Sequence, residues 1–310
     1  MPKTKSTDRV SIFEVGPRDG LQNERKVVPT RHKMKFIYGL VEAGIRDLEI
    51  GSFVRPDRVP QMADTDLIYR AIRLGKMDLG QARAWALVPN RRGLERALRA
   101  GVTHIAVFTA ATESFTRKNI GMSIDKSLAE FKSLIADGRK ILGKKLMIRG
   151  YVSTAFGCPF EGKVPPKSAL AVIEKLADLG VDQISVGDTI GVATPADIDA
   201  LMNPALRLLG VRKTAVHLHD TRGTALANAL RAYQIGIRTF DSSAGGIGGC
   251  PFAPGASGNL ATEDLVYMFN GMGVEHGIDL EKLSRASLEV SVVMSRPLSS
   301  RYLQSLTSRC

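Results

Sequence analysis

The stretch TAVHLHDTRGTALANALRAYQIGIRTFDSS, residues 214–243, shows the pattern that decides the fold. A short strand-like run comes first, a polar turn follows, and apolar residues then recur at helical spacing up to Gly236. A second strand-like run, residues 238–243, comes directly after that glycine. A strand, a turn, a helix and a strand in this order indicate a βαβ unit, in which the two strands run parallel.

The same unit recurs along the chain. The other segments with strand character are residues 10–15, 45–51, 82–88, 104–109, 146–152 and 182–187. Further amphipathic helical segments lie between them, for example residues 31–44, 92–101 and 167–180. Glycines suited to the position after a helix precede several strands: Gly44, Gly101, Gly180 and Gly236.

Strands that alternate with helices predict a parallel sheet in an α/β fold. Eight such repeats in 310 residues favour closure into a (β/α)8 TIM barrel over an open, doubly wound sheet. No linker or low-complexity segment divides the chain, so we expect a single domain over residues 1–310. The barrel would span about 10–275, with a C-terminal helical extension at about 276–310. Chemistry in such barrels lies at the C-terminal ends of the strands.

Composition narrows the class of protein. Hydrophobic residues make up 44% of the chain and charged residues 24%, which is ordinary for a globular domain. No apolar run is long enough to span a membrane, and the N-terminal MPKTKSTDRV lacks the apolar segment of a signal peptide. The 3 cysteines are scattered and form no disulfide framework. We therefore expect a cytoplasmic protein.

The net charge of +12 raises the question of a nucleic-acid partner. The basic residues occur in short, dispersed clusters, and aromatic residues are only 6% of the chain. An anionic small substrate, such as a carboxylate or a phosphorylated coenzyme, accounts for the charge more simply. We expect no nucleic-acid or membrane partner.

Polar residues stand at the ends of the first two predicted strands. Arg18 and Asp19 follow the first strand, although Pro-Arg-Asp-Gly is also a good turn sequence. Glu49 lies within the second strand, where a buried carboxylate is costly unless it is paired. Arg18 is its natural partner, either as a structural ion pair or as part of a site.

His217 and His219 are two residues apart on a predicted strand, so they point to the same face and can share one metal ion. Asp220 points to the other face and suits the start of the next helix. Asp188, at another strand end, can cap a helix or order its loop. Two imidazoles with oxygen ligands, and no cysteine nearby in sequence, suit Mg²⁺ or Mn²⁺, with zinc as an alternative.

Several longer motifs occur together and in order. They strongly resemble the 3-hydroxy-3-methylglutaryl-CoA lyases, of the bacterial type, which belong to the metal-dependent TIM-barrel lyases and Claisen-type synthases. The resemblance runs from about residue 10 to the end of the chain. The motifs are VGPRDGLQNE (15–24), EIGSFV (49–54) with VPQMAD (59–64), GYVSTAFGCPFEG (150–162), GDTIGVATP (187–195), HLHDTRGTALANAL (217–230) and GGIGGCPFAPGASGNLATED (245–264).

The resemblance implies a homodimeric enzyme of leucine degradation that cleaves 3-hydroxy-3-methylglutaryl-CoA to acetyl-CoA and acetoacetate. The metal ligands that it implies are Asp19, His217, His219 and Asn259. The catalytic residues that it implies are Arg18, Glu49 and Cys250, with Asp19 or His217 as alternatives for the base. The substrate-site residues that it implies are Gln22, Ser52 and Asp188.

The chemistry of the residues agrees with this reaction. A metal chelated by the substrate lowers the pKa of its tertiary hydroxyl, and an arginine beside the thioester oxygen stabilises the enolate. Glu49 would hold Arg18 in place. Cys250 would act as an acid or a base in proton transfer to the acetyl-CoA carbanion. Its glycine-rich loop, residues 244–259, is predicted to close over the substrate.

Some positions depart from the family pattern and leave the acyl group open. Pro56, Asp57 and Arg58 stand where Pro-Lys-Trp is common, and Arg25 replaces a familiar lysine. A lyase for citramalyl-CoA or another 3-hydroxyacyl-CoA is therefore an alternative. So is a Claisen-type synthase, whose familiar pattern is His-x-His-Asn-Asp.

Three alternatives from other classes are a nucleic-acid-binding barrel, a non-catalytic barrel and a Cys-His hydrolase. A hydrolase built on Cys250 lacks an obvious orienting partner for its histidine and leaves Asn259 and the histidine pair unexplained. Cys310, the last residue of the sequence, is a candidate for a redox-sensitive bridge between subunits.

Overall fold

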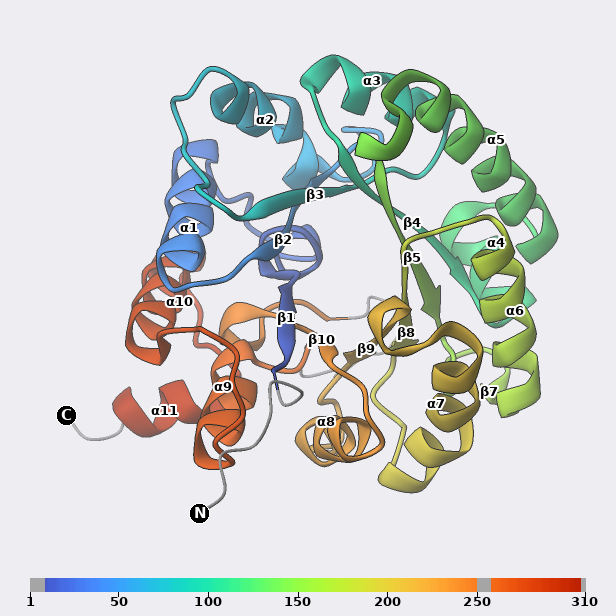
Figure 1. Cartoon of the computed structure of the whole chain (residues 1–310). Helices are drawn as coiled ribbons and strands as arrows, with labels where there is room; N and C mark the ends of the chain where they lie inside the picture. Colours follow the sequence, from blue (N-terminus) through green and yellow to red (C-terminus); the bar gives the residue numbers. More distant parts are fainter. Residues whose placement is uncertain (1–8, 250–257, 308–310) are drawn as a thin grey trace.

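The computed structural model describes residues 9–249 and 258–307, and within them eight strands close into a barrel. Hydrogen-bonded neighbours follow the order β1-β10-β9-β8-β5-β4-β3-β2, and every pairing between them is parallel. Helices surround this barrel on the outside (Figure 1). The predicted (β/α)8 fold is confirmed.

All eight barrel strands lie within two residues of the segments that the sequence predicts. They are β1 (Ser11–Glu14), β2 (Asp47–Ser52), β3 (Arg83–Leu87), β4 (His104–Ala110), β5 (Met147–Ser153), β8 (Gln183–Asp188), β9 (Thr214–Leu218) and β10 (Thr239–Ser242). A short antiparallel ribbon after β5, formed by β6 (Gly157–Cys158) and β7 (Gly162–Lys163), was not predicted.

The α-helices fill the intervals between strands and the C-terminal region. They are α1 (Thr30–Glu42), α2 (Thr65–Arg73), α3 (Arg91–Ala100), α4 (Glu113–Ile120), α5 (Ile124–Leu142), α6 (Pro166–Asp178), α7 (Pro195–Leu209), α8 (Ala225–Gln234), α9 (Thr262–Gly271), α10 (Leu280–Met294) and α11 (Arg301–Thr307). Gly101 follows α3 with φ of 86°, which is favourable only for glycine, as predicted. In the C-terminal region, α10 packs against α1 and α9.

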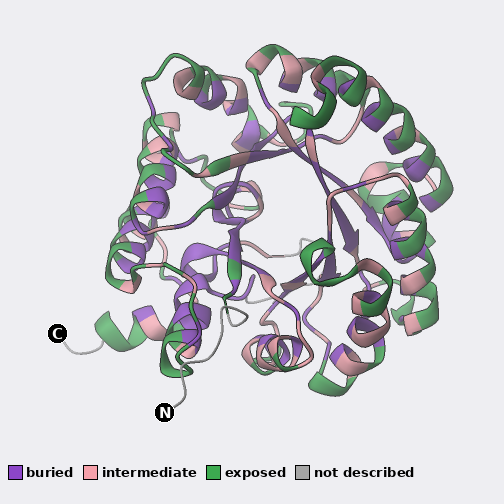
Figure 2. Ribbon diagram, in the orientation of Figure 1, coloured by how far each residue is buried: buried purple, intermediate pink, exposed green. Residues whose placement is uncertain are grey.

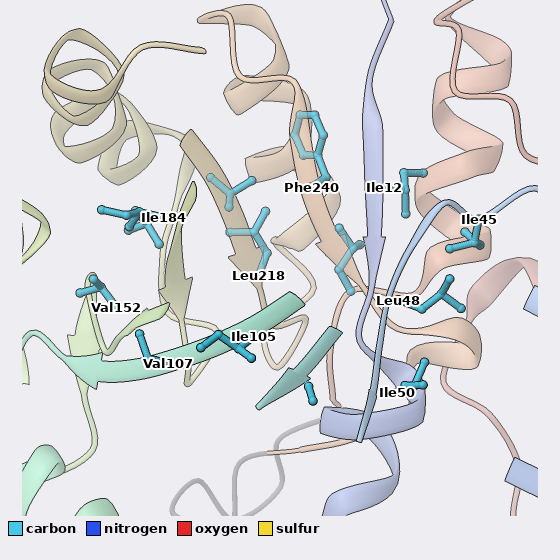
Figure 3. Packing of buried hydrophobic residues seen from close by; sticks show 14 of the residues in the cluster. Ile12, Ile45, Leu48, Ile50, Ile105, Val107, Val152, Ile184, Leu218 and Phe240 are labelled. Carbon is cyan, nitrogen blue, oxygen red and sulfur yellow. The ribbon is translucent and has the colours of Figure 1, made fainter. Parts of the chain in front are cut away.

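The hydrophobic core has an outer layer and an inner one. The outer layer packs alternate strand residues, such as Leu48, Ile184 and Phe240, against the helices (Figure 3). Figure 2 shows the consequence: the helices are buried on the side that faces the sheet and exposed on the other. The inner layer holds small apolar clusters within the barrel, one of them around Phe13 and Trp85.

Because neighbouring residues on a strand point to opposite faces, each outward apolar side chain alternates with one inside the barrel. Several of the inner side chains are charged or polar, including Glu49, Arg149, Ser185 and Asp241. Among the helices of the described residues, none has an apolar stretch long enough to span a membrane. These polar side chains continue toward the C-terminal end of the barrel, where His217 and His219 lie.

Candidate active site

Arg18 and Asp19 lie in a single π-helical turn, η1 (Gly16–Gly20), directly after β1. The Arg18 side chain turns back toward β2, where its Nε and Nη2 donate to Glu49 Oε2 at 2.9 and 2.6 Å. Its Nη1 donates to Asp19 Oδ1 at 2.6 Å. The predicted ion pair between Arg18 and Glu49 is therefore present.

Glu49 is fully buried, and it also accepts a hydrogen bond from the Tyr151 hydroxyl at 3.0 Å. Burial raises the pKa of Glu49, while the positive charge of Arg18 opposes that rise. Burial alone would lower the pKa of Arg18, but Glu49 and Asp19 more than compensate and raise it. The guanidinium is thus held as a fixed cation at the barrel mouth.

The histidine pair lies opposite this arginine at the end of β9. His217 Nε2 and His219 Nε2 are 3.1 Å apart, and ligand atoms of both rings and of Asp19 lie within 4.8 Å of one another. Burial and the neighbouring His217 lower the pKa of His219 to about 3, so that imidazole is neutral near pH 7. Burial would raise the pKa of Asp19, but Arg18 and the histidines lower it to about 2.

Asn259 reaches the same place from the far side of the loop after β10. Its backbone forms an isolated bridge with His219, and Leu260 N donates to Leu218 O at 2.9 Å. The Asn259 amide nitrogen donates to Asp19 Oδ2 at 2.8 Å. The four ligands implied by the resemblance therefore meet at one point.

This group of side chains fits a divalent cation. Asn259 Oδ1 is buried and has no hydrogen-bond partner among the described residues. The amide nitrogen of the same side chain contacts Asp19, whose carboxylate lies close to two imidazole nitrogens that face each other. Two imidazoles with an amide and a carboxylate oxygen are ligands that Mg²⁺, Mn²⁺ and related divalent ions accept. The buried amide oxygen would gain a partner if such an ion were bound.

A cavity of about 150 Å³ opens beside these ligands. A cavity of this size holds one small organic molecule of roughly benzene size. Its lining combines polar residues, among them Arg18, Asp19, Gln22, Ser185, His217 and His219, with apolar and aromatic ones, among them Leu87, Phe108, Phe115 and Tyr151. Gln22 lines this cavity, and its buried Oε1 has no partner in the described chain; its role toward substrate stays a prediction.

Ser52 and Asp188, the other two predicted substrate residues, are buried and do not line this cavity. Ser52 Oγ donates to Leu87 O at 3.4 Å. Asp188 accepts from the backbone of Val192 and Ala193 at 3.0 and 2.9 Å, so it orders the loop after β8. Their roles toward substrate stay predictions.

Strand alternation explains the position of Asp188. Ser185 and Gly187 of β8 line the cavity, so Asp188 points to the opposite face. The same rule is confirmed for Asp220, whose Oδ1 accepts from Ala225 N at 2.9 Å, at the start of α8.

Four interior residues of the site were missed: Arg149, Tyr151, Ser185 and Asp241. A signal for them was present in the sequence. Arg149 and Asp241 are charged residues inside predicted strands, which is the feature that drew attention to Glu49. Alternation then places Tyr151 on the same face as Arg149.

Cys250 lies outside the described residues, and so do residues 251–257 of its loop. The part before it is well anchored. Ala244 N donates to Glu14 Oε1 at 2.9 Å, and the next amide, that of Gly245, donates to Glu263 Oε2 at 2.8 Å. Two buried carboxylates therefore hold consecutive amides at the beginning of the loop.

Comparison with known proteins agrees with this geometry. The family model described as HMGL-like matches residues 9–290, a range that includes Asp19, His217, His219 and Asn259. The chain belongs to the HMGL-like family. Hydroxymethylglutaryl-CoA lyase YngG of Bacillus subtilis is 45% identical to this HMGL-like chain over 296 residues, covering 96% of the chain and 97% of that relative. The mitochondrial hydroxymethylglutaryl-CoA lyase of Rattus norvegicus is 46% identical, covering 96% of the chain and 89% of the relative.

Solved structures show the same likeness. The HMG-CoA lyase of Bacillus subtilis superposes with a TM-score of 0.92 at 43% identity, covering 99% of this HMGL-like chain and 100% of the other. An HMG-CoA lyase from Acinetobacter baumannii, in complex with coenzyme A and 3-methylmalate, gives a TM-score of 0.91 at 35% identity, covering 97% and 96% of the two chains. The predicted family is therefore confirmed.

Proposed function

We propose that the protein is a carbon–carbon lyase that cleaves 3-hydroxy-3-methylglutaryl-CoA to acetyl-CoA and acetoacetate with a divalent cation, Mg²⁺ or Mn²⁺. The observation that carries the proposal is the meeting of Asp19, His217 and His219 beside the Arg18–Glu49 pair at the barrel mouth. The membership of the HMGL-like family, with lyases at 45% identity over nearly the whole chain, supports the choice of reaction.

The reaction needs a proton removed and a proton added. The hydroxyl at C3 of the substrate loses its proton, the C2–C3 bond breaks, and C3 becomes the ketone of acetoacetate. The electron pair of that bond passes to C2 as the enolate of acetyl-CoA. A proton then adds to C2, so atoms and charge balance.

Asp19, His217, His219 and Asn259 would hold the cation. When bound, it supplies Lewis-acid polarisation that favours loss of the hydroxyl proton. Asp19 and His217 both line the cavity and are the candidates to take that proton, Asp19 before His217, because a cation on Nε2 would leave His217 only its Nδ1 for this role. The low pKa of Asp19, held down by Arg18 against the effect of burial, keeps it ionised near neutral pH.

Arg18 would stabilise the thioester enolate. Its guanidinium lines the cavity, and Glu49 and Tyr151 hold it from behind, so it need not reorient as charge develops. Gln22 would bind the substrate from the cavity wall. Ser52, at the end of β2, and Asp188, at the end of β8, do not line the cavity and would act on the substrate through the loops that follow those strands. Cys250, outside the described residues, would give or take the proton at C2.

A cleavage assay over a small panel of 3-hydroxyacyl-CoA thioesters tests the proposal. We expect acetyl-CoA and acetoacetate from the 3-hydroxy-3-methylglutaryl thioester, dependence on added Mg²⁺ or Mn²⁺, and loss of activity with a chelator. Citramalyl-CoA in the same panel tests the nearest alternative substrate. Release of free CoA from acetyl-CoA and a 2-oxo acid would instead identify a Claisen-type synthase.

The cellular setting belongs to the same proposal. We place the protein in the cytoplasm, because its 3 cysteines are scattered and give no disulfide framework. We also assign it a single domain over residues 1–310 and a homodimeric state. Light scattering coupled to gel filtration tests the dimer, and non-reducing gels test a bridge through Cys310, which lies outside the described residues.

A further inference from the structure

The two ring nitrogens of His217 face different partners. Nε2 points to the proposed metal position, 3.1 Å from His219 Nε2. Nδ1 points into the barrel, where it lies 3.3 Å from Asp241 Oδ2. The buried His219 Nδ1, by contrast, has no hydrogen-bond partner among the described residues. The structure therefore orients only one of the two imidazoles through a second side chain.

Asp241 is itself held from two sides. Its Oδ1 accepts from Arg149 Nη2 at 2.5 Å, and its Oδ2 accepts from Ser185 Oγ at 2.7 Å. Donors therefore face both oxygens, one of them the guanidinium of a buried arginine, so Asp241 acts as a carboxylate that only accepts hydrogen bonds. His217 must then be the donor, which places its proton on Nδ1.

The burial of Arg149 at this position costs free energy. It is fully buried, its guanidinium carbon lies 3.7 Å from the centre of the Phe13 ring, and its Nε and Nη1 have no partner among the described residues. An arginine buried with unpartnered N–H groups contributes little net stability. It does, however, present only donors, so the atom of residue 241 that faces it must be an acceptor.

We propose that Asp241, oriented by Arg149 and Ser185, is a positioning residue that keeps the proton of His217 on Nδ1 and so presents an unprotonated Nε2 to the divalent cation. The inference rests on the metal site of the proposed function. It adds three interior residues to that site, none of which is a ligand. A carboxylate that accepts from a ligating histidine both orients the ring and raises its basicity.

The substitution Asp241→Asn tests this proposal sharply because Arg149 dictates how the new amide must lie. Its oxygen has to face Arg149, which leaves the NH₂ group toward Ser185 and His217. The hydroxyl of Ser185 can rotate to accept, whereas His217 can accept only through Nδ1. The proton of His217 would then move to Nε2, the nitrogen that the metal requires.

Two measurements follow. The first is the ¹⁵N NMR spectrum of the histidine-labelled full chain, without metal and with Mg²⁺. We expect His217 to carry its proton on Nδ1 in the wild type and on Nε2 in Asp241→Asn. The second is a Mn²⁺ titration followed by EPR, in which Asp241→Asn should raise the Kd by about 10- to 100-fold.

Asp47→Asn is the matched control. Asp47 is also a buried interior carboxylate with an arginine partner, Arg83, but it belongs to the opposite end of the barrel and does not contact His217. We expect its Mn²⁺ affinity to equal that of the wild type, even where its thermal stability falls. An equal loss of Mn²⁺ affinity in both variants would reduce the role of Asp241 to general support of the barrel and overturn the proposal.

Two other outcomes overturn it as well. One is a wild-type His217 protonated on Nε2, a result that stands even if the variant does not fold. The other is an Asp241→Asn protein that binds Mn²⁺ with unchanged Kd. These outcomes are separate from failure of the proposed function, which would appear as a wild type that binds Mn²⁺ and leaves the 3-hydroxy-3-methylglutaryl thioester intact.

Discussion

The two ends of the barrel interior carry similar side chains but partner them differently. At the N-terminal end, Asp47 accepts from the Trp85 indole at 2.8 Å with one oxygen and pairs with Arg83 through the other. Two residues further along the same strand, Glu49 accepts from Arg18 and Tyr151 through Oε2 alone, and its buried Oε1 has no partner among the described residues.

This difference extends across the mouth of the barrel. Buried polar atoms of Gln22, His219 and Asn259 also have no hydrogen-bond partner in the described part of the chain. Such atoms cost free energy in a folded protein, so a cluster of them at one end needs a reason. Asp47 thus has a partner for each of its oxygens, whereas several buried polar atoms at the mouth have none, as we expect of a surface that the proposed substrate and cation would contact.

The largest effect that we expect comes from Cys250→Ala, which probes the glycine-rich segment after β10. If the thiol moves a proton, kcat should fall by about 10²- to 10⁴-fold, while folding and Mn²⁺ binding are kept. Steady-state kinetics and a Mn²⁺ titration measure the two properties. Cys158→Ala is the control, since that buried thiol packs in the outer core and accepts from Thr112. Wild-type turnover by the Cys250 variant would remove the thiol from the mechanism.

Two histidines, one at each end of the barrel, allow a second comparison. His217→Ala should weaken Mn²⁺ binding by at least about 100-fold because it removes a ligand rather than a supporting group. His104→Ala removes the histidine that packs edge-on against Trp85 at the N-terminal end, 4.9 Å between ring centres. The His104 variant should differ from the wild type in its free energy of unfolding and keep the same metal content. Elemental analysis of the two purified variants measures this, and unchanged metal in the His217 variant would contradict the ligand assignment.

The smallest effect concerns the pH dependence of stability, through a carboxylate that supports the mouth. Burial raises the pKa of Glu263 from 4.5 to about 8, so the folded protein holds this proton more tightly than the unfolded chain. That contribution to stability is present below about pH 4.5 and is lost as pH rises toward 8, at about 1.4 kcal/mol per pH unit at most.

Glu263→Gln removes this titration, so its urea midpoint should fall less than that of the wild type between pH 5 and 8. Glu14→Gln should act with the same sign over a narrower range, since burial raises the pKa of Glu14 only to about 7. Parallel pH profiles for the wild type and the Glu263 variant would show that this carboxylate is not protonated in the folded protein.

Much of this protein was predictable from local pattern. The alternation of strands and helices predicted the barrel, because apolar periodicity reports which face of each element is buried. The spacing of His217 and His219 predicted their common face, and the burial of Glu49 predicted its pairing with Arg18. Asp188 was placed in the substrate site by resemblance, although alternation from Ser185 already points it away from the cavity.

The sequence by itself determined the eight βα repeats, the family and which residue types stand at the strand ends. Only the tertiary structure decided that Asn259 meets Asp19, 240 residues earlier in the chain, and that Arg149 and Asp241 join beneath His217. The physical reason is ring closure. Pairing of β1 with β10 brings the first loop of the chain beside the last, and no local pattern specifies a contact that depends on every strand between them.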